Sequence, residues 1–254
     1  MGSDFEAEHR PPTPLQRQLL NHLDRALLVL GRFEEDPRTA AMDARTSIEQ
    51  AEAALILLRH LDPSAARGQR RALRAAWRVL GPLCGHRSRL RPDAPPPLAP
   101  IARAWVQEVT ANLAAARLEL DLPRWHAPPN GPAVRSNAVR TYAKARKRWR
   151  REQSQPARVG GRGSTAKTLR TARRVRFQVE ALCGPGGSGG PGGSGGPGRS
   201  GGPGGLGTDD RDRSIVESDL AGYFSSTPTD YGRWLSEVCG WQDQAGGNLG
   251  AGLG

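Results

Sequence analysis

Apolar residues recur every three or four positions along most of residues 14–182, a spacing typical of helices that bury one face. The first such stretch begins at Pro14 and ends at Gly31, so a helix is predicted between them. Its apolar positions are Leu15, Leu19, Leu23, Leu27 and Leu30. His22 lies beside this stripe, and we interpret it as a structural residue.

Two Asp-Pro pairs mark the starts of the next helices, because Asp is a good N-cap and Pro suits the first helical position. Asp36 opens a helix that stops near His60, and Asp62 opens one that breaks at Gly81. The latter helix places four arginines along one line: Arg67, Arg71, Arg74 and Arg78. This line is a candidate cationic stripe, unless acidic residues elsewhere in this half pair with it.

A Pro-rich connector over residues 91–100 separates these helices from a fourth one. The fourth helix ends near Leu122, and its apolar residues follow one side of the helix. They are Ile101, Trp105, Val109, Leu113, Ala116 and Leu120. A loop over residues 127–132 then leads into the most basic part of the chain.

Residues 133–151 predict a helix with one apolar and one cationic face. The apolar face comprises Val134, Ala138, Tyr142, Ala145 and Trp149, and the opposite face comprises Arg140, Lys144, Lys147, Arg148 and Arg151. A second amphipathic helix follows the candidate N-cap Ser164. Its apolar face comprises Leu169, Ala172, Val175, Val179 and Leu182, and its cationic face comprises Lys167, Arg170, Arg173 and Arg174. Phe177 lies among these cations.

These two helices carry nearly all of the net charge. The 254 residues contain 37 Lys and Arg against 25 Asp and Glu. Residues 123–182 hold sixteen of the basic residues and only two acidic ones, Glu152 and Glu180. An ordinary solvated surface mixes both signs, so two consecutive basic stripes favour a polyanion as partner.

Composition points to an all-α helical bundle. Only 5% of the residues are aromatic, so Leu, Ala and Val must form the core of one globular unit of about 170 residues. The three cysteines are widely spaced, which predicts neither a disulfide framework nor a metal clip and favours a reducing cytoplasm. No apolar run approaches the roughly 18 residues that a membrane span needs. The expected location is therefore cytoplasmic.

The chain divides into four expected parts. Residues 1–13 form a disordered N-terminus, 14–183 a helical domain, 184–208 a flexible Gly/Pro/Ser linker and 209–254 a mostly disordered tail. The tail holds an amphipathic segment with Ile215, Val216, Leu220, Phe224, Tyr231, Trp234, Leu235, Val238 and Trp241. We interpret this segment as a tethered peptide that docks on a partner or folds back onto the basic face. A tail without function is the alternative.

No catalytic motif accompanies these helices. The chain has no HExxH sequence, no paired His and Cys at metal-binding spacing and no nucleophile elbow, and its five histidines are scattered. We therefore expect a protein that is not an enzyme and that needs no cofactor or metal.

The order of the helices resembles the CHAD domain, an all-helical family that is named for its histidines and binds inorganic polyphosphate. The segments that carry the resemblance are DPRTAAMDARTSIEQAEAALILLRHL, LRAAWRVLGPL, VRTYAKARKRWR and TLRTARRVRFQVEAL. The resemblance covers residues 15–182 and implies a helical bundle of two similar halves, each contributing cations to a polyphosphate site.

The departures from the family pattern fall at site positions. Met42 stands where the first half of the family carries His, whereas Arg45 is retained. Cys84 and Gly85 replace the Arg-Asp pair that usually follows LGPL, and the expected second His falls near Ala166. The second half keeps its positive charge at Arg170, Arg173 and Arg176.

These observations predict a non-enzymatic polyanion-binding protein with inorganic polyphosphate as its partner. Guanidinium groups contact phosphate oxygens bidentately, and rigid helices hold them in register. The expected binding residues are Arg45, Arg140, Lys144, Lys147, Arg148, Arg151, Lys167, Arg170, Arg173, Arg174 and Arg176. One alternative is RNA or single-stranded nucleic acid, whose bases would stack on aromatic residues. Another is a degenerate helical scaffold that acts on a protein partner through its aromatic C-terminal tail.

Overall fold

The computed structural model describes residues 12–84, 99–126, 131–154, 162–183 and 224–241. Their regular secondary structure is helical, with no strand among them, which confirms the all-α prediction. The chain forms two compact units. The first ends at Val134, and the second begins at Arg135 and takes in the C-terminal helix. The single helical domain expected over residues 14–183 is thus shared between two units.

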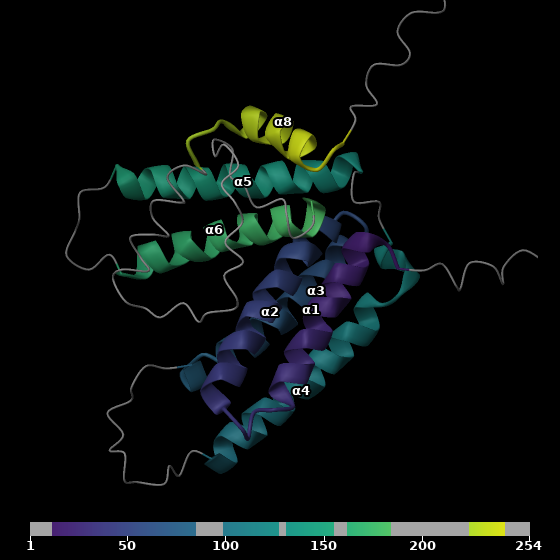
Figure 1. The fold of residues 1–254 in the computed structure, drawn as a ribbon, viewed down its shortest axis with the longest axis vertical. Helices are drawn as coiled ribbons and strands as arrows, with labels where there is room; N and C mark the ends of the chain where they lie inside the picture. The colour runs from purple at the N-terminus through teal and green to yellow at the C-terminus, as the bar shows by residue number, and fades with distance from the viewer. Residues whose placement is uncertain (1–11, 85–98, 127–130, 155–161, 184–223, 242–254) are drawn as a thin grey trace, which may run out of the picture. The chain divides into compact units, whose positions relative to one another are not determined.

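The first unit is a bundle of four helices (Figure 1). They are α1 (Pro14–Leu30), α2 (Pro37–Leu58), α3 (Pro63–Val79) and α4 (Ala99–Leu120). Short 3-10 turns, η2 (Pro82–Cys84) and η3 (Pro123–Trp125), follow α3 and α4. The helix α1 packs on α2 and α4, and α3 packs on the same two helices, so the four close into a ring around one core.

The predicted helix starts are confirmed by their caps. The Asp36 carboxylate accepts a hydrogen bond from the Thr39 backbone N–H at 3.0 Å, and the Asp62 carboxylate accepts one from the Ala65 N–H at 2.9 Å. Each bond satisfies a backbone donor that the helix itself leaves without a partner. At the start of α1, Thr13 caps in the same way. The Asp-Pro pairs therefore fix where α2 and α3 begin.

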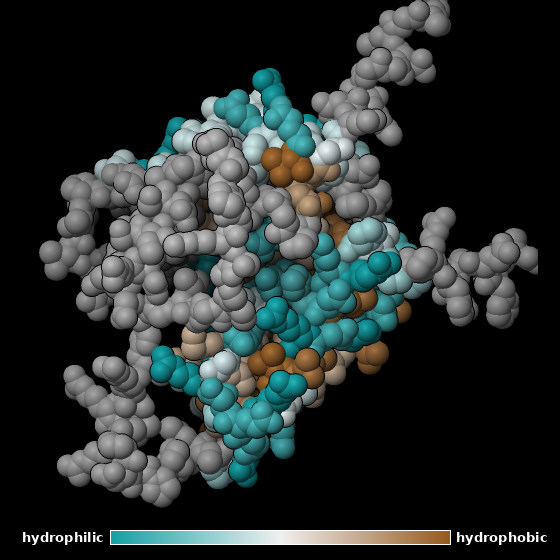
Figure 2. Space-filling view, viewed as in Figure 1, coloured by the Kyte–Doolittle hydropathy of each residue, from teal (hydrophilic) through white to brown (hydrophobic). Residues whose placement is uncertain are grey.

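The buried side of α4 differs from the predicted one. Its core positions are Ala102, Val106, Val109, Leu113, Ala116 and Leu120. Ile101 and Trp105, which the sequence places on the same stripe, are 49% and 36% exposed. The helix is rotated so that alanine and valine meet the bundle near its N-terminus. Leu28 of α1 and Leu118 of α4 are also exposed, and Figure 2 shows hydrophobic side chains between hydrophilic ones on the surface of this unit.

The arginine line on α3 is only partly a free cationic stripe. Arg74 and its neighbour Arg70 each donate from Nε to Oε1 of Glu52 on α2, both at 2.7 Å. The Glu52 side chain is only 8% exposed, so the two arginines compensate a carboxylate that would otherwise be buried without a partner. Arg71 and Arg78 remain exposed.

The second unit places α5 (Pro132–Gln153) between α6 (Arg162–Cys183) and α8 (Pro228–Val238), as Figure 1 shows. Both neighbours run antiparallel to α5: Trp149 near its C-terminal end meets Phe224, which precedes α8, and Arg148 meets Thr171 in the first half of α6. The helix α6 begins two residues before Ser164. Ser164 therefore lies inside the helix, and the prediction that it acts as the N-cap is wrong.

The C-terminal segment packs on the aromatic side of α5. The Tyr142 and Tyr231 rings stack in parallel with their centroids 3.9 Å apart. The Tyr142 hydroxyl donates to the Ser226 carbonyl at 2.8 Å, and Arg146 Nε donates to the Phe224 carbonyl at 3.1 Å. The sequence allowed a partner or the basic face of the chain as docking site. The segment instead covers the apolar face of α5, because burying aromatic area is favourable.

A disulfide joins Cys183 at the end of α6 to Cys239 at the end of α8, with the two Cα atoms 4.5 Å apart. This corrects the prediction from cysteine spacing, since folding brings together two residues that are 56 positions apart. Cys84 forms no disulfide. Disulfides persist mainly in oxidising compartments, which weighs against the reducing cytoplasm expected from the sequence.

No helix in the described part of the chain is both long enough and apolar enough to span a bilayer. The expected N-terminal segment and the Gly/Pro/Ser linker lie almost entirely outside the described residues.

We predict that His22 makes the first unit less stable in mild acid. Burial, and secondarily the charge of Arg25, lower the pKa of His22 from 6.5 to about 4. Between these values the unfolded chain binds a proton that the folded chain does not, so the free energy of unfolding should fall by up to about 3 kcal/mol as the pH drops from 6.5 to 4. Urea titrations across this range would measure the fall. His22→Gln should flatten it, and an unchanged slope in this variant would contradict the assignment.

We also predict that Cys239→Ser destabilises the second unit. Closing a loop of this length lowers the entropy of the unfolded chain, and loss of the bond should cost about 2–4 kcal/mol. Urea unfolding followed by aromatic fluorescence under non-reducing conditions would measure the loss. Cys84→Ser is the matched control and should keep the original midpoint, whereas equal midpoints for the two variants would contradict the prediction.

Candidate polyanion-binding surface

The cationic side of α5 is exposed as predicted. Arg140, Lys144, Lys147 and Arg151 are all exposed and form no ion pair with described residues. The apolar side is buried, since Val134, Ala138 and Tyr142 are 0% exposed. Burial of the apolar side fixes the rotation of the helix about its axis. The cations therefore lie on the exposed side because the apolar side is packed, and not because they form ion pairs with described residues.

Arg148 connects the cationic side of α5 to α6. Its Nη1 donates to Thr171 Oγ1 at 3.1 Å, so the guanidinium lies over the seam between the two helices. On α6, Arg170 directly precedes Thr171 and is exposed. Arg173 and Arg174 are partly buried, and both make contacts within the protein. Arg148 of α5 thus contacts α6 at the residue that follows Arg170.

Arg176 and Arg45 stand apart from this group. Arg176 Nε donates to Glu180 Oε1 at 2.9 Å, so an ion pair offsets its charge. The side chain of Lys167 lies outside the described residues. Arg45 belongs to α2 in the first unit, where its guanidinium carbon lies 3.7 Å from the centroid of the Trp77 ring. This cation-π contact gives Arg45 a structural role within the first unit.

Arg146 has a role that the charge pattern did not reveal. It is only 9% exposed, and its guanidinium donates to the carbonyls of Phe224 and Ser225, which precede α8. Carbonyl groups at the end of a loop are satisfied best by donors on a neighbouring element. Arg146 is therefore a structural residue that fixes the C-terminal segment, although it sits within the most basic run of the chain.

The aromatic residues of α5 are fully or partly covered in this fold. Tyr142 is fully buried under Tyr231. Burial raises the pKa of the Tyr142 phenol, and the charge of the nearby Arg146 offsets part of this increase. The phenol is consequently neutral near pH 7 and can donate to Ser226. Trp149 is partly buried and packs against Phe224. Phe177 of α6 is partly buried as well. The exposed surface therefore offers cations with few stacking partners.

In the described part of the chain, no group of three or more His, Cys, Asp or Glu side chains is placed to hold a metal ion.

In comparisons with known proteins, no family model, no curated protein and no solved structure matches the chain.

Proposed function

We propose that the second unit is a non-enzymatic polyanion-binding module and that its ligand is inorganic polyphosphate. The observation that carries the proposal is the row Arg140, Lys144, Lys147 and Arg151, whose side chains are exposed and have no acidic partner among the described residues. Like charges at helical spacing destabilise the helix that carries them. A bound polyanion removes this repulsion and gains charge-assisted hydrogen bonds.

The spacing of the row suits an extended repeating anion. Arg151 lies eleven positions after Arg140, which corresponds to about 16 Å along the helix axis. Arg148 and Arg170 widen the row into a band across the seam between α5 and α6. Rigid helices keep the band in register, so little ordering of the protein accompanies binding. The resemblance of residues 15–182 to CHAD domains favours the same ligand.

Polyphosphate is favoured over nucleic acid because of the aromatic residues. Proteins that bind single strands combine a basic groove with aromatic side chains on which the bases stack. Here Tyr142 packs under Tyr231, and Trp149 packs against Phe224. A ligand with phosphates alone needs no such platform. The same packing weighs against an aromatic tail that is free for a protein partner, because the segment is already docked on its own chain.

We predict that removing three cations from α5 weakens binding of long-chain polyphosphate. Lys144→Gln, Lys147→Gln and Arg151→Gln together should lower the affinity at least tenfold at low salt, because fewer counterions are released on binding. The slope of log affinity against log salt should become less steep by about 2. Isothermal titration of the full chain across a salt series would measure both.

The matched control removes three exposed arginines from α3 by Arg67→Gln, Arg71→Gln and Arg78→Gln. This variant has the same net charge as the first and should keep most of the affinity. Equal losses in both variants would mean that only the overall charge matters, which contradicts the proposed site. Single-stranded RNA serves as the competing ligand, and RNA affinity that matches polyphosphate at every salt concentration would contradict the choice of ligand.

A further inference from the structure

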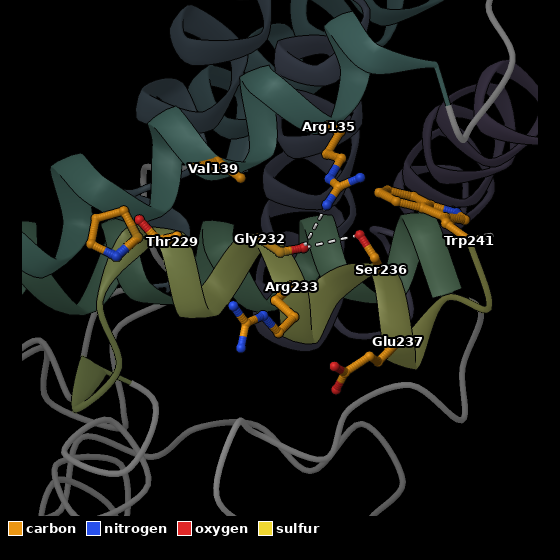
Figure 3. Close-up of a pocket in the computed structure, with 9 residues that line it drawn as sticks. Arg135, Val139, Thr229, Gly232, Arg233, Ser236, Glu237 and Trp241 are labelled. Carbon is orange, nitrogen blue, oxygen red and sulfur yellow. Dashed lines mark hydrogen bonds between the residues drawn. The ribbon is translucent and has the colours of Figure 1, made fainter. Parts of the chain in front are cut away.

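The two units differ in how they cover their apolar surfaces. In the second unit, α8 lies along the apolar side of α5, and Figure 3 shows Arg135 of α5 and Ser236 of α8 meeting at the Gly232 carbonyl. In the first unit, α4 has a second apolar side, which remains exposed. Ile101 and Leu118 on this side are 49% and 69% exposed. A helix that is apolar all round is normally buried all round, so this side of α4 is a candidate interaction surface.

The exposed side of α4 has the spacing by which two helices pack along their length. Its positions recur at alternating intervals of three and four residues, as in the packed seam of a coiled coil. They are Ile101, Ala104, Glu108, Ala111, Ala115 and Leu118, which together form the outer face of α4, and all six are exposed. Trp105 is exposed directly beside this face. The buried side of α4 therefore serves the bundle, and the outer face has the pattern of a second helix contact.

The outer face has nearly the same order of residues when it is read from either end of the helix. Ile101 and Leu118 stand at its two ends, and Ala104 and Ala115 are the next positions inward. A twofold axis between two identical antiparallel helices places each residue opposite its mirror position in the other copy. Ile101 then faces the partner's Leu118, and Ala104 faces the partner's Ala115. This order fits a second copy of the same helix.

The middle of the outer face is also complementary to itself. Glu108 is exposed and forms no ion pair with described residues, and Asn112 is exposed one turn further along the helix. In the antiparallel arrangement Glu108 lies opposite the partner's Ala111, next to the partner's Asn112. A carboxylate accepts a hydrogen bond from a side-chain amide, and the twofold axis produces this pair twice. The small Ala111 leaves room for both groups.

The charges of α4 argue against a lipid surface as the partner. A helix that lies on a membrane carries free cationic side chains along the edges of its apolar face. The two basic residues of α4 are Arg103 and Arg117. Arg103 donates to Glu34, and Arg117 donates to Asp24 of α1. The edges of the outer face therefore offer little net positive charge to anionic lipids.

We propose that the first unit forms a symmetric dimer, in which the outer face of α4 packs antiparallel on the outer face of α4 in a second copy. The helix has 22 residues and is about 33 Å long. A pair of helices of this length gives an interface at the lower end of the stable range, roughly 1,200 Å². The dimer should therefore dissociate at about micromolar concentration. This inference goes beyond the proposed function, which rests on α5 and α6.

The test is sedimentation velocity of the full chain from roughly 1 to 200 µM, a range that brackets a micromolar dissociation constant. The mass should rise from that of the 27.3 kDa chain toward twice this value. A Cys84→Ser background excludes a dimer that is linked through this cysteine. A chain that stays monomeric over the whole range would overturn the proposal and leave the outer face to a different protein.

Substitutions at Ala111 locate the interface. Ala111→Glu places a carboxylate against the partner's Glu108, and this repulsion should weaken the dimer at least tenfold. Ala111→Lys places a cation at the same point and should weaken the dimer much less. Ala75→Glu, on the exposed side of α3, is the matched control and should dimerise like the original chain. Equal dimer affinities for Ala111→Glu and Ala75→Glu, at equal urea midpoints, would contradict the interface. If Ala111→Glu fails to fold, Leu118→Gln decides the question, because this exposed position contributes little to the bundle itself.

A further comparison separates the dimer from polyphosphate binding. Lys144→Gln, Lys147→Gln and Arg151→Gln together should leave the dimer affinity unchanged, because these residues lie in the second unit. Ala111→Glu should leave the polyphosphate affinity of each chain unchanged. Loss of the dimer in the triple variant would mean that the chains associate through the cationic row, which contradicts the outer face of α4 as the interface.

Discussion

The stacking of Tyr231 on Tyr142 is the contact on which the second unit depends. Without α8, the buried face of α5 would present Tyr142 and part of Trp149 to water. Without α5, an eleven-residue helix such as α8 would not be stable, because isolated helices of this length are marginal in water. Each helix thus supplies the apolar surface that the other lacks. The disulfide from Cys183 to Cys239 then restrains the end of α8 against α6.

This packing also determines where the charges lie. Because one side of α5 is committed to Tyr231 and its neighbours, Lys144, Lys147 and Arg151 point away from the contact with α8. A helix so rich in basic residues has little stability of its own, since neighbouring like charges repel. Tertiary burial offsets that cost. The cationic row and the stacked aromatic pair are consequently two results of the same amphipathic pattern.

Two buried polar residues of the first unit, Gln16 and Glu52, bind groups on neighbouring helices. Gln16 is 0% exposed, and its Nε2 donates to the Leu120 carbonyl at the end of α4, which is a backbone acceptor that the helix itself leaves without a partner. Glu52 is held by Arg70 and Arg74. Such contacts add specificity to a core of leucine and alanine, whose packing alone would tolerate several rotations of each helix. They link α1 to the end of α4 and α2 to α3.

By itself, the sequence determined the features that depend on neighbours along the chain. The caps at Asp36 and Asp62, the limits of α1, α2 and α3, and the division of α5 into an apolar and a cationic side all follow from residues within one or two turns of each other. Only the tertiary structure decided the rotation of α4, the ion pairs of Glu52 and the bond between Cys183 and Cys239. These features join residues far apart in the chain, and many packings satisfy the same local pattern until the helices meet.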